Sequence, residues 1–185
     1  ERRQKYLVLR HDIEFSVERA FSLAQIETEE GISSSWFVQI TNNAYNPFSQ
    51  ECTKMLKKMA NNGHHIGLHY HRGSAEKTEE IAEDVVRQAQ ILEEMTGIRI
   101  DRFSFHRPPA EFLTADLTAG NLINTYGHSF FSYSESPDDM LPVKYIADSN
   151  HQWKYGWAEK AYFDKFDKIQ LLIHPLSWSK QGADH

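Results

Sequence analysis

The sequence predicts an α/β protein built of βα units around a mostly parallel sheet. Short apolar runs alternate with longer amphipathic runs, which is typical of βα units in a mostly parallel sheet. Several of the apolar runs end directly in a histidine or an aspartate. No linker, repeat or low-complexity segment divides the 185 residues, so we expect a single domain over residues 1–185.

The first half of the chain contains the clearest units. Ser16 and Ser49 can cap two helices, and Gly31, Gly63 and Gly97 can adopt the left-handed conformation that ends a helix. A third helix is predicted from apolar residues at helical spacing between positions 81 and 92. The predicted strands of this half cover residues 6–10, 35–39, 65–68 and 102–105.

In the second half, the pattern predicts a helix over 114–122, an aromatic strand near Phe130 and a strand over 144–147. Residues 168–173 form a continuous apolar run, which favours a strand buried on both faces.

Composition narrows the class of protein. The net charge is −6 and no stripe of Lys and Arg appears, so a nucleic-acid partner is not expected. No apolar run reaches the roughly 18 residues that a membrane span needs. Cys52 is the one cysteine and cannot form an internal disulfide, which fits a reducing compartment and predicts a cytoplasmic protein. The sequence does not indicate an oligomeric state.

Four polar residues mark the ends of predicted strands: Asp12, His69, His106 and His174. In α/β barrels the carboxyl ends of the strands meet at the edge that carries the catalytic groups. Imidazoles with one carboxylate suit Zn²⁺, and a catalytic site needs about three protein ligands. The pattern therefore predicts one divalent cation, best matched by Zn²⁺. The alternative for Asp12 is a helix cap, and for His69 a core histidine.

Five segments resemble, in order, the motifs of polysaccharide deacetylases of the NodB-homology type, carbohydrate esterase family 4. The resemblance covers nearly the whole chain and implies the distorted (β/α)7-type barrel of that family. The first segment resembles a branch with Arg-His-Asp in place of the usual paired aspartates. The segments are L-R-H-D-I-E at 9–14, G-H-H-I-G-L-H at 63–69, H-R-P-P at 106–109, D-S-N-H-Q-W at 148–153 and I-H-P at 173–175.

The resemblance implies a ligand set for the cation. Asp12 and His69 take the first two ligand positions. The family's usual second histidine is replaced by Gly73, so the third ligand must come from elsewhere. We expect His106, with His71 as the alternative.

The resemblance also implies catalytic roles. His174 is expected to protonate the leaving group, and Arg107 to orient a catalytic carboxylate. Because the paired aspartate is lost, the base is His11 or Glu14, or is absent. The expected substrate-lining residues are Pro108, Asp148 and Trp153.

These expectations describe a metal-dependent hydrolase that removes an acyl group, such as acetyl, from a sugar of a bacterial surface polysaccharide or its precursor. Two alternatives remain open at this point. One is a hydrolase of non-sugar amide C–N bonds on the same scaffold, since a fold does not fix a function. The other is a carbohydrate-binding protein that is catalytically impaired.

Overall fold

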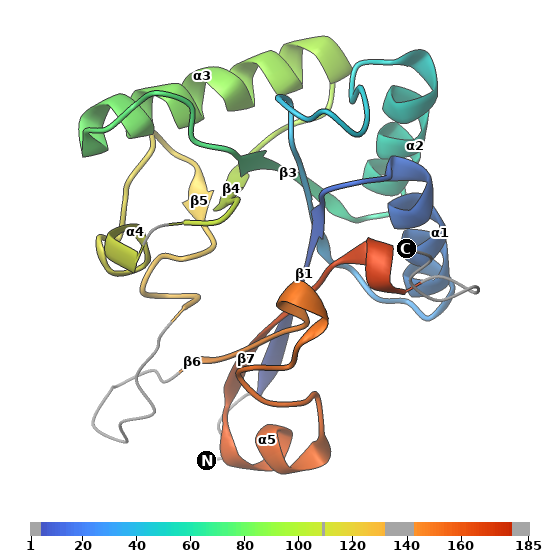
Figure 1. Cartoon of the computed structure of the whole chain (residues 1–185). Helices are drawn as coiled ribbons and strands as arrows, with labels where there is room; N and C mark the ends of the chain where they lie inside the picture. Colours follow the sequence, from blue (N-terminus) through green and yellow to red (C-terminus); the bar gives the residue numbers. More distant parts are fainter. Residues whose placement is uncertain (1–4, 109, 132–142, 179–185) are drawn as a thin grey trace.

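A computed structural model describes residues 5–108, 110–131 and 143–178 of the chain. Pro109, part of the third motif, lies outside the described residues. Seven parallel strands form one curved sheet in the order β5-β4-β3-β2-β1-β7-β6, a half-barrel with no pairing between β5 and β6 in the described residues (Figure 1). The strands are β1 (Tyr6–Ile13), β2 (Ser35–Val38), β3 (His65–Tyr70), β4 (Arg102–Phe105), β5 (Ile123–Asn124), β6 (Val143–Ala147) and β7 (Lys168–Ile173).

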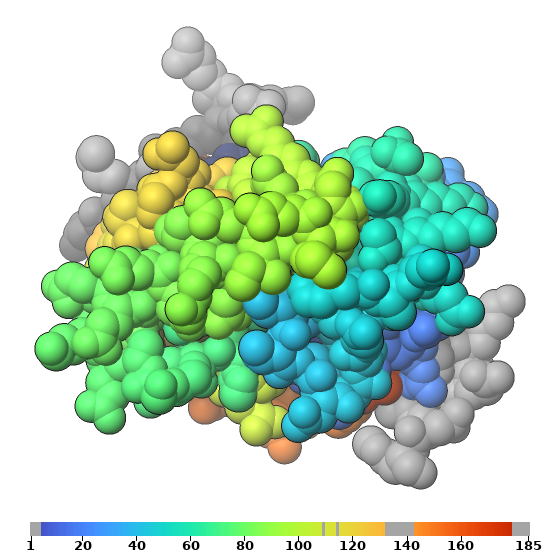
Figure 2. Space-filling view, turned by 90° about the horizontal axis from the view of Figure 1, so that it is seen from above, coloured from blue at the N-terminus to red at the C-terminus, as the bar shows by residue number. Residues whose placement is uncertain are grey.

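Three long helices cover one face of this sheet. Helices α1 and α2 pack on each other, α1 contacts β1, and both α2 and α3 contact β3. Seen from above, the outer surface consists largely of α3 and of the segment around α2 (Figure 2). None of the helices in the described ranges is long and apolar enough to cross a membrane. The helices are α1 (Val17–Glu29), α2 (Gln50–Asn61), α3 (Thr78–Thr96), α4 (Ala110–Thr114) and α5 (Lys160–Lys165), with 3-10 turns at η1 (Ser149–His151) and η2 (Pro175–Ser177).

The helix boundaries follow the local sequence. The hydroxyl of Ser16 accepts a hydrogen bond from the backbone N–H of Arg19 at 3.1 Å, and that of Ser49 accepts one from Cys52 at 3.2 Å. Gly97 ends α3 in the left-handed conformation, with φ of 65°. The two predicted caps and this predicted stop are confirmed, because each depends on a few neighbouring residues.

The two faces of the sheet differ in polarity because side chains alternate along each strand. Apolar side chains point to the helices, and this layer includes Trp36, Val38, Leu68 and Phe103, each fully buried. The opposite, inner face of the half-barrel carries polar residues at the intervening positions of β1, β3, β4 and β7. Gly67 lies on this inner face, where a side-chain carbon would meet the ring of Phe37 at 2.6 Å.

Two predictions for the second half are wrong. No helix covers 114–122: α4 ends at Thr114, and an antiparallel bridge joins Ala119 and Leu122 just before β5. Phe130 lies in a turn. Its neighbour Phe131 is buried instead and packs on two tyrosine rings at centroid distances of 5.0 Å each. Phe131 is therefore part of the packed interior, and the rest of the aromatic run, from residue 132 on, lies outside the described residues. The strands predicted at 144–147 and 168–173 are present as β6 and β7.

Candidate metal centre and catalytic site

The alternation along β1 decides which charged side chains enter the half-barrel. Strand β1 continues to Ile13, three residues beyond the predicted end. Arg10, Asp12 and Glu14 therefore share the inner face at a spacing of two, while His11 and Ile13 point to the helices. Glu14 follows the last residue of β1 directly and is only partly buried.

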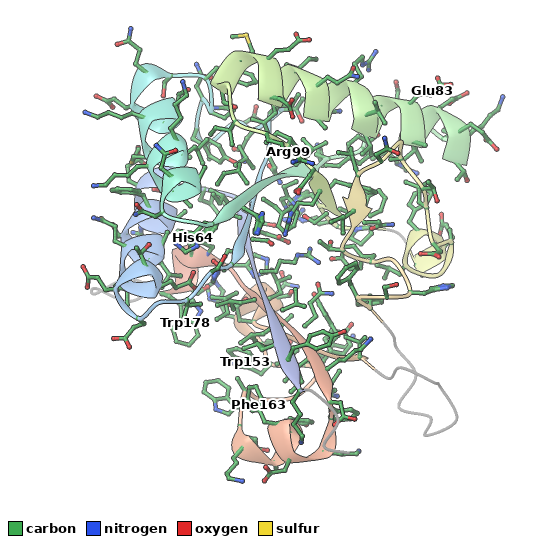
Figure 3. The ribbon with its side chains drawn as sticks, turned by 180° about the vertical axis from the view of Figure 1, so that it is seen from behind. His64, Glu83, Arg99, Trp153, Phe163 and Trp178 are labelled. Atoms are coloured by element: carbon green, nitrogen blue, oxygen red, sulfur yellow. The ribbon has the colours of Figure 1, made fainter. Side chains whose placement is uncertain are left out.

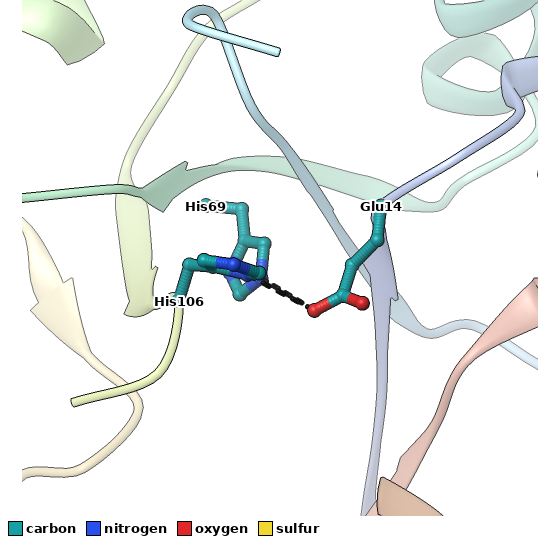
Figure 4. A group of neighbouring side chains, drawn as sticks. All are labelled: Glu14, His69 and His106. Carbon is teal, nitrogen blue, oxygen red and sulfur yellow. Dashed lines mark hydrogen bonds and ion pairs between the residues drawn. The ribbon is translucent and has the colours of Figure 1, made fainter. Parts of the chain in front are cut away.

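Glu14, His69 and His106 form a compact group whose ligand atoms all lie within 4.8 Å of one another (Figure 4). Glu14 Oε1 lies 3.0 Å from His106 Nδ1 and 3.7 Å from His69 Nε2. The two imidazole nitrogens are 3.3 Å apart. The residues come from the ends of β1, β3 and β4, which are brought together by the parallel sheet. His71, the alternative third ligand, is exposed, with its ring 5.1 Å from that of His106.

This group fits a divalent cation. A tetrahedral Zn²⁺ with nitrogen and oxygen ligands at about 2.0–2.1 Å requires ligand atoms roughly 3.3 Å apart. The three separations in the group lie close to that value. Two imidazoles and one carboxylate are also a common donor set of catalytic zinc sites.

Asp12 lines the same cavity but has other partners. Arg10 donates to both of its oxygens, at 3.0 and 2.8 Å, and both side chains are almost fully buried. Burial raises the pKa of Asp12, but the positive charge of Arg10, with those of His69 and His174, outweighs it and brings the pKa to about 2. Asp12 Oδ2 lies 3.8 Å from His69 Nε2.

Ser104 connects Asp12 to His69. The Ser104 hydroxyl lies 2.7 Å from His69 Nδ1 and donates to Asp12 Oδ1 at 3.4 Å. Because the hydroxyl donates to the carboxylate, it accepts the hydrogen of His69 Nδ1. The lone pair of His69 Nε2 then faces Glu14 and His106, as a metal-binding imidazole requires.

Glu14 is held as a carboxylate. Burial raises its pKa, but the hydrogen bond from His106 and the charge of His174 outweigh this effect, so the pKa of Glu14 lies well below its usual range. A negative oxygen among three imidazoles is a favourable arrangement for a cation ligand.

His11, expected as a base, does not line the cavity. It is fully buried on the helical side of β1, where its Nε2 lies 2.7 Å from Glu27 on α1 and its ring stacks on Trp36 at 3.9 Å. Glu27 in turn accepts a hydrogen bond from Ser34. The reason is the strand geometry: neighbouring residues point to opposite faces, so Asp12 and His11 cannot both reach the inner face.

His174 faces the group from the end of β7. Its Nε2 lies 4.0 Å from Glu14 Oε1, and its Nδ1 lies 2.6 Å from Asp148 Oδ1. Burial lowers the pKa of His174, but the hydrogen bond to Asp148 and the charges of Asp12, Asp148 and Glu14 outweigh it and raise the pKa above the ordinary value. The imidazole is therefore suited to carry a proton near neutral pH.

Asp148, expected to contact substrate, also anchors His174. Besides the imidazole, its oxygens accept from the backbone N–H of His174 at 3.0 and 3.1 Å and from Trp178 Nε1 at 2.8 Å. Trp153 does not line the cavity; it packs against Trp157 and Trp178 outside it, at centroid distances of 4.6 and 6.3 Å (Figure 3).

The cavity around these groups has a volume of about 750 Å³. Arg107 and Pro108 line it, as expected for the third motif. Arg107 has a positive φ of 49°, an uncommon conformation for a non-glycine residue that is found often at functional sites. No carboxylate within the described ranges pairs with its guanidinium.

Two residues of the site were not found from the sequence: Arg10 and Ser104. Both carried a usable signal. Arg10 stands two residues before Asp12 and four before Glu14, and Ser104 stands two before His106. A spacing of two within a strand places side chains on one face, so it could have located both at the inner wall.

Comparisons with known proteins agree with this fold. A family model described as polysaccharide deacetylase matches residues 3–129. A family 4 carbohydrate esterase from Bacillus anthracis is similar, with a TM-score of 0.58 and 17% identity over 99% of this chain and 72% of that chain. The peptidoglycan deacetylase PdaC from Bacillus subtilis has a TM-score of 0.55 and 14% identity over 98% of this chain and 79% of that chain. A CE4 family pseudoenzyme from Bacillus anthracis has a TM-score of 0.51 and 13% identity over 93% of this chain and 55% of that chain.

At these identities the structures show the fold, which confirms the predicted distorted barrel. No curated protein matches this chain significantly.

Proposed function

Because this chain belongs to the polysaccharide deacetylase family, we propose that it is a metal-dependent hydrolase that removes an acetyl group from a sugar. The substrate that we propose is a unit of a bacterial surface polysaccharide or its precursor. The cation that best suits the donor set is Zn²⁺, held by Glu14, His69 and His106.

The observation that supports the proposal is the placement of an acid opposite a cation site within one cavity. His174 Nε2 lies 4.0 Å from the Glu14 oxygen that also contacts His69 and His106. A cation at this group would supply Lewis-acid chemistry, which polarises an acyl carbonyl. The acetyl group of a substrate would therefore lie in the cavity that Glu14, His69 and His174 line.

His174 would protonate the leaving nitrogen or oxygen of the sugar. Its Nδ1 is engaged by Asp148, so the proton available to the substrate is on Nε2. Asp148 is itself held by two other donors, which restricts rotation of the imidazole. A positioned acid of this kind contributes about 10²–10⁴-fold to the rate.

Asp12 and Ser104 would act on the cation site through His69. The chain of hydrogen bonds from Arg10 through Asp12 and Ser104 fixes the orientation of the imidazole. Partners of this kind are worth about 10–100-fold in metal affinity. Arg10 keeps Asp12 ionised, and Asp12 is then a permanent acceptor.

A second function has one observation in its favour: the base is not evident. His11 lies on the other face of β1, Glu14 lies within the cation group, and the pKa of Asp12 of about 2 makes this carboxylate a weak proton acceptor. A protein with this arrangement could bind an acetylated sugar without hydrolysing it.

One experiment separates these functions. The metal-free protein is loaded with Zn²⁺ and incubated with N-acetylglucosamine oligomers and, separately, with N-acetyl-lysine. Released acetate is measured, together with oligomer binding by calorimetry. We expect zinc-dependent acetate from the oligomers, reduced in His174→Ala. Acetate from N-acetyl-lysine alone would favour a non-sugar amide hydrolase. Oligomer binding without acetate would favour the carbohydrate-binding protein.

A further inference from the structure

A second cavity of about 310 Å³ lies against the cation group. It shares Phe105, Arg107 and Pro108 with the large cavity, so the two are neighbours along the segment that follows β4. His106 lines the second cavity, while its Nδ1 lies 3.0 Å from Glu14 in the cation group. A substrate whose acetyl group lies at the cation group can therefore extend into this second space.

The second cavity is lined by positive and neutral side chains. Arg72 and Arg107 contribute two guanidinium groups, and His71 and His106 contribute imidazoles. Among its lining residues in the described chain there is no aspartate or glutamate. This composition contrasts with the net charge of −6 of the whole chain.

The two guanidinium groups have no acidic partner in the described ranges. Three other arginines of the described ranges do: Arg10 pairs with Asp12, Arg87 with Asp84, and Arg102 with Asp101. Arg72 and Arg107 are both exposed at the cavity, so their donors are available to a ligand. A guanidinium is a rigid fork of donors that matches a carboxylate or a phosphate.

The floor of the cavity is aromatic. Phe105 and Phe112 are buried and stack on each other at 5.9 Å, and Tyr70 is held by a hydrogen bond to Asp84 at 2.9 Å. Arg72 lies 5.9 Å from the Phe112 ring centroid, a contact that holds its charge beside this floor. An aromatic floor beside fixed positive charges recognises a ring with an anionic substituent.

We propose that the second cavity is a subsite for an anionic group, a carboxylate or a phosphate, carried by the sugar substrate and bound by Arg72 and Arg107. This inference rests on the proposed function for its substrate class. It makes the preferred substrate an acidic or phosphorylated acetylated sugar.

The test is equilibrium binding to the zinc-loaded protein, measured by calorimetry. The probes are N-acetylglucosamine, N-acetylmuramic acid and N-acetylglucosamine 6-phosphate, which are neutral, carboxylated and phosphorylated. The variants are Arg72→Gln and Arg107→Gln. The matched control is Arg99→Gln, because Arg99 is exposed and precedes β4, at the opposite end of the strand from the site (Figure 3).

We expect at least one charged probe to bind more tightly than the neutral probe. Arg72→Gln and Arg107→Gln should each weaken that probe by roughly 10- to 150-fold, the scale of a hydrogen bond to a charged group. Arg72→Gln should leave the neutral probe unchanged, and Arg99→Gln should change nothing. Whether the carboxylate or the phosphate probe is the affected one identifies the source of the anion.

Two results would overturn the subsite: equal affinity for all three probes, or equal weakening in Arg99→Gln and Arg72→Gln. Failure of the proposed function has a different signature. In that case no acetate is released from any sugar, yet the charged probe still binds in a manner that depends on Arg72 and Arg107.

Discussion

Asp12 and Glu14 stand two residues apart on one face of β1, and isosteric variants of the two should fail in different ways. Asp12→Asn leaves the guanidinium of Arg10 buried without a carboxylate, since both side chains are almost fully buried. Removing one partner of a buried pair costs about 3–5 kcal/mol. For a chain of this size 1 kcal/mol moves the Tm by roughly 2–4 °C, so the metal-free variant should melt roughly 6–20 °C lower.

Glu14→Gln should instead affect the cation. Its side chain is 22% exposed, so loss of its charge should leave the Tm of the metal-free protein nearly unchanged. Loss of a hydrogen-bond partner of a metal ligand weakens metal binding by about 10–100-fold, and Glu14→Gln should weaken zinc binding by more than that. Ser104→Ala provides that reference, since it removes only the 2.7 Å contact to His69 Nδ1.

The assays are thermal unfolding by circular dichroism with a chelator present, and zinc affinity by competition with a chromogenic chelator. The assignment of Glu14 as ligand would be refuted by one pattern of results. In that pattern Glu14→Gln binds zinc like the wild type, while Asp12→Asn loses the ion and keeps the wild-type Tm.

Three other perturbations test the acid, the buried network and the packing of the inner face. His174→Ala should retain zinc, measured by metal analysis, but lose about 10²–10⁴-fold in turnover, with an amide affected more than an activated ester; equal losses would argue against an acid role. Burial raises the pKa of Glu27, but its contact with His11 and the hydrogen bond from Ser34 outweigh burial and lower it. The ionised Glu27 therefore stabilises the fold above its ordinary pKa of about 4.3, and this stability is lost as the pH falls through the lower pKa of the folded state. Urea titrations across pH should therefore show that Glu27→Gln is less stable at pH 7 and loses less stability in acid; parallel pH curves would contradict this. Gly67→Ala places a carbon 2.6 Å from Phe37 and should cost about 1–3 kcal/mol in urea unfolding, whereas Gly73→Ala, with nothing within 4 Å, should cost little.

The sequence alone determined the order of strands and helices in the first half of the chain and the end of β7. Helix caps at Ser16 and Ser49 and the stop at Gly97 depend on hydrogen bonds between residues three or four apart, so they can be recognised from the sequence alone. The prediction of a strand at Phe130 failed, because this residue lies in a turn and its neighbour Phe131 packs on two tyrosine rings. Burial in the barrel and pairing in a sheet demand the same residue types, and no local signal distinguishes them.

The sequence also determined that Asp12, His69, His106 and His174 stand at or near the carboxyl ends of strands, although β1 and β3 each continue one residue beyond Asp12 and His69. What only the tertiary structure decided is which side chains meet. Glu14 joined the two histidines because β1 runs to Ile13 and keeps positions 10, 12 and 14 on its inner face. That register is set by pairing with β2 and β7, strands distant in the sequence.

The same geometry separated residues that are adjacent in the chain. Arg10, which enters the inner face with Asp12, binds this carboxylate, while His11 on the opposite face contacts Glu27 on α1. A strand sends neighbouring side chains to opposite sides, and the distant elements on each side then decide their partners. Motif order therefore located the edge of the sheet that carries the site, but contacts between residues far apart in sequence assigned each side chain its partner.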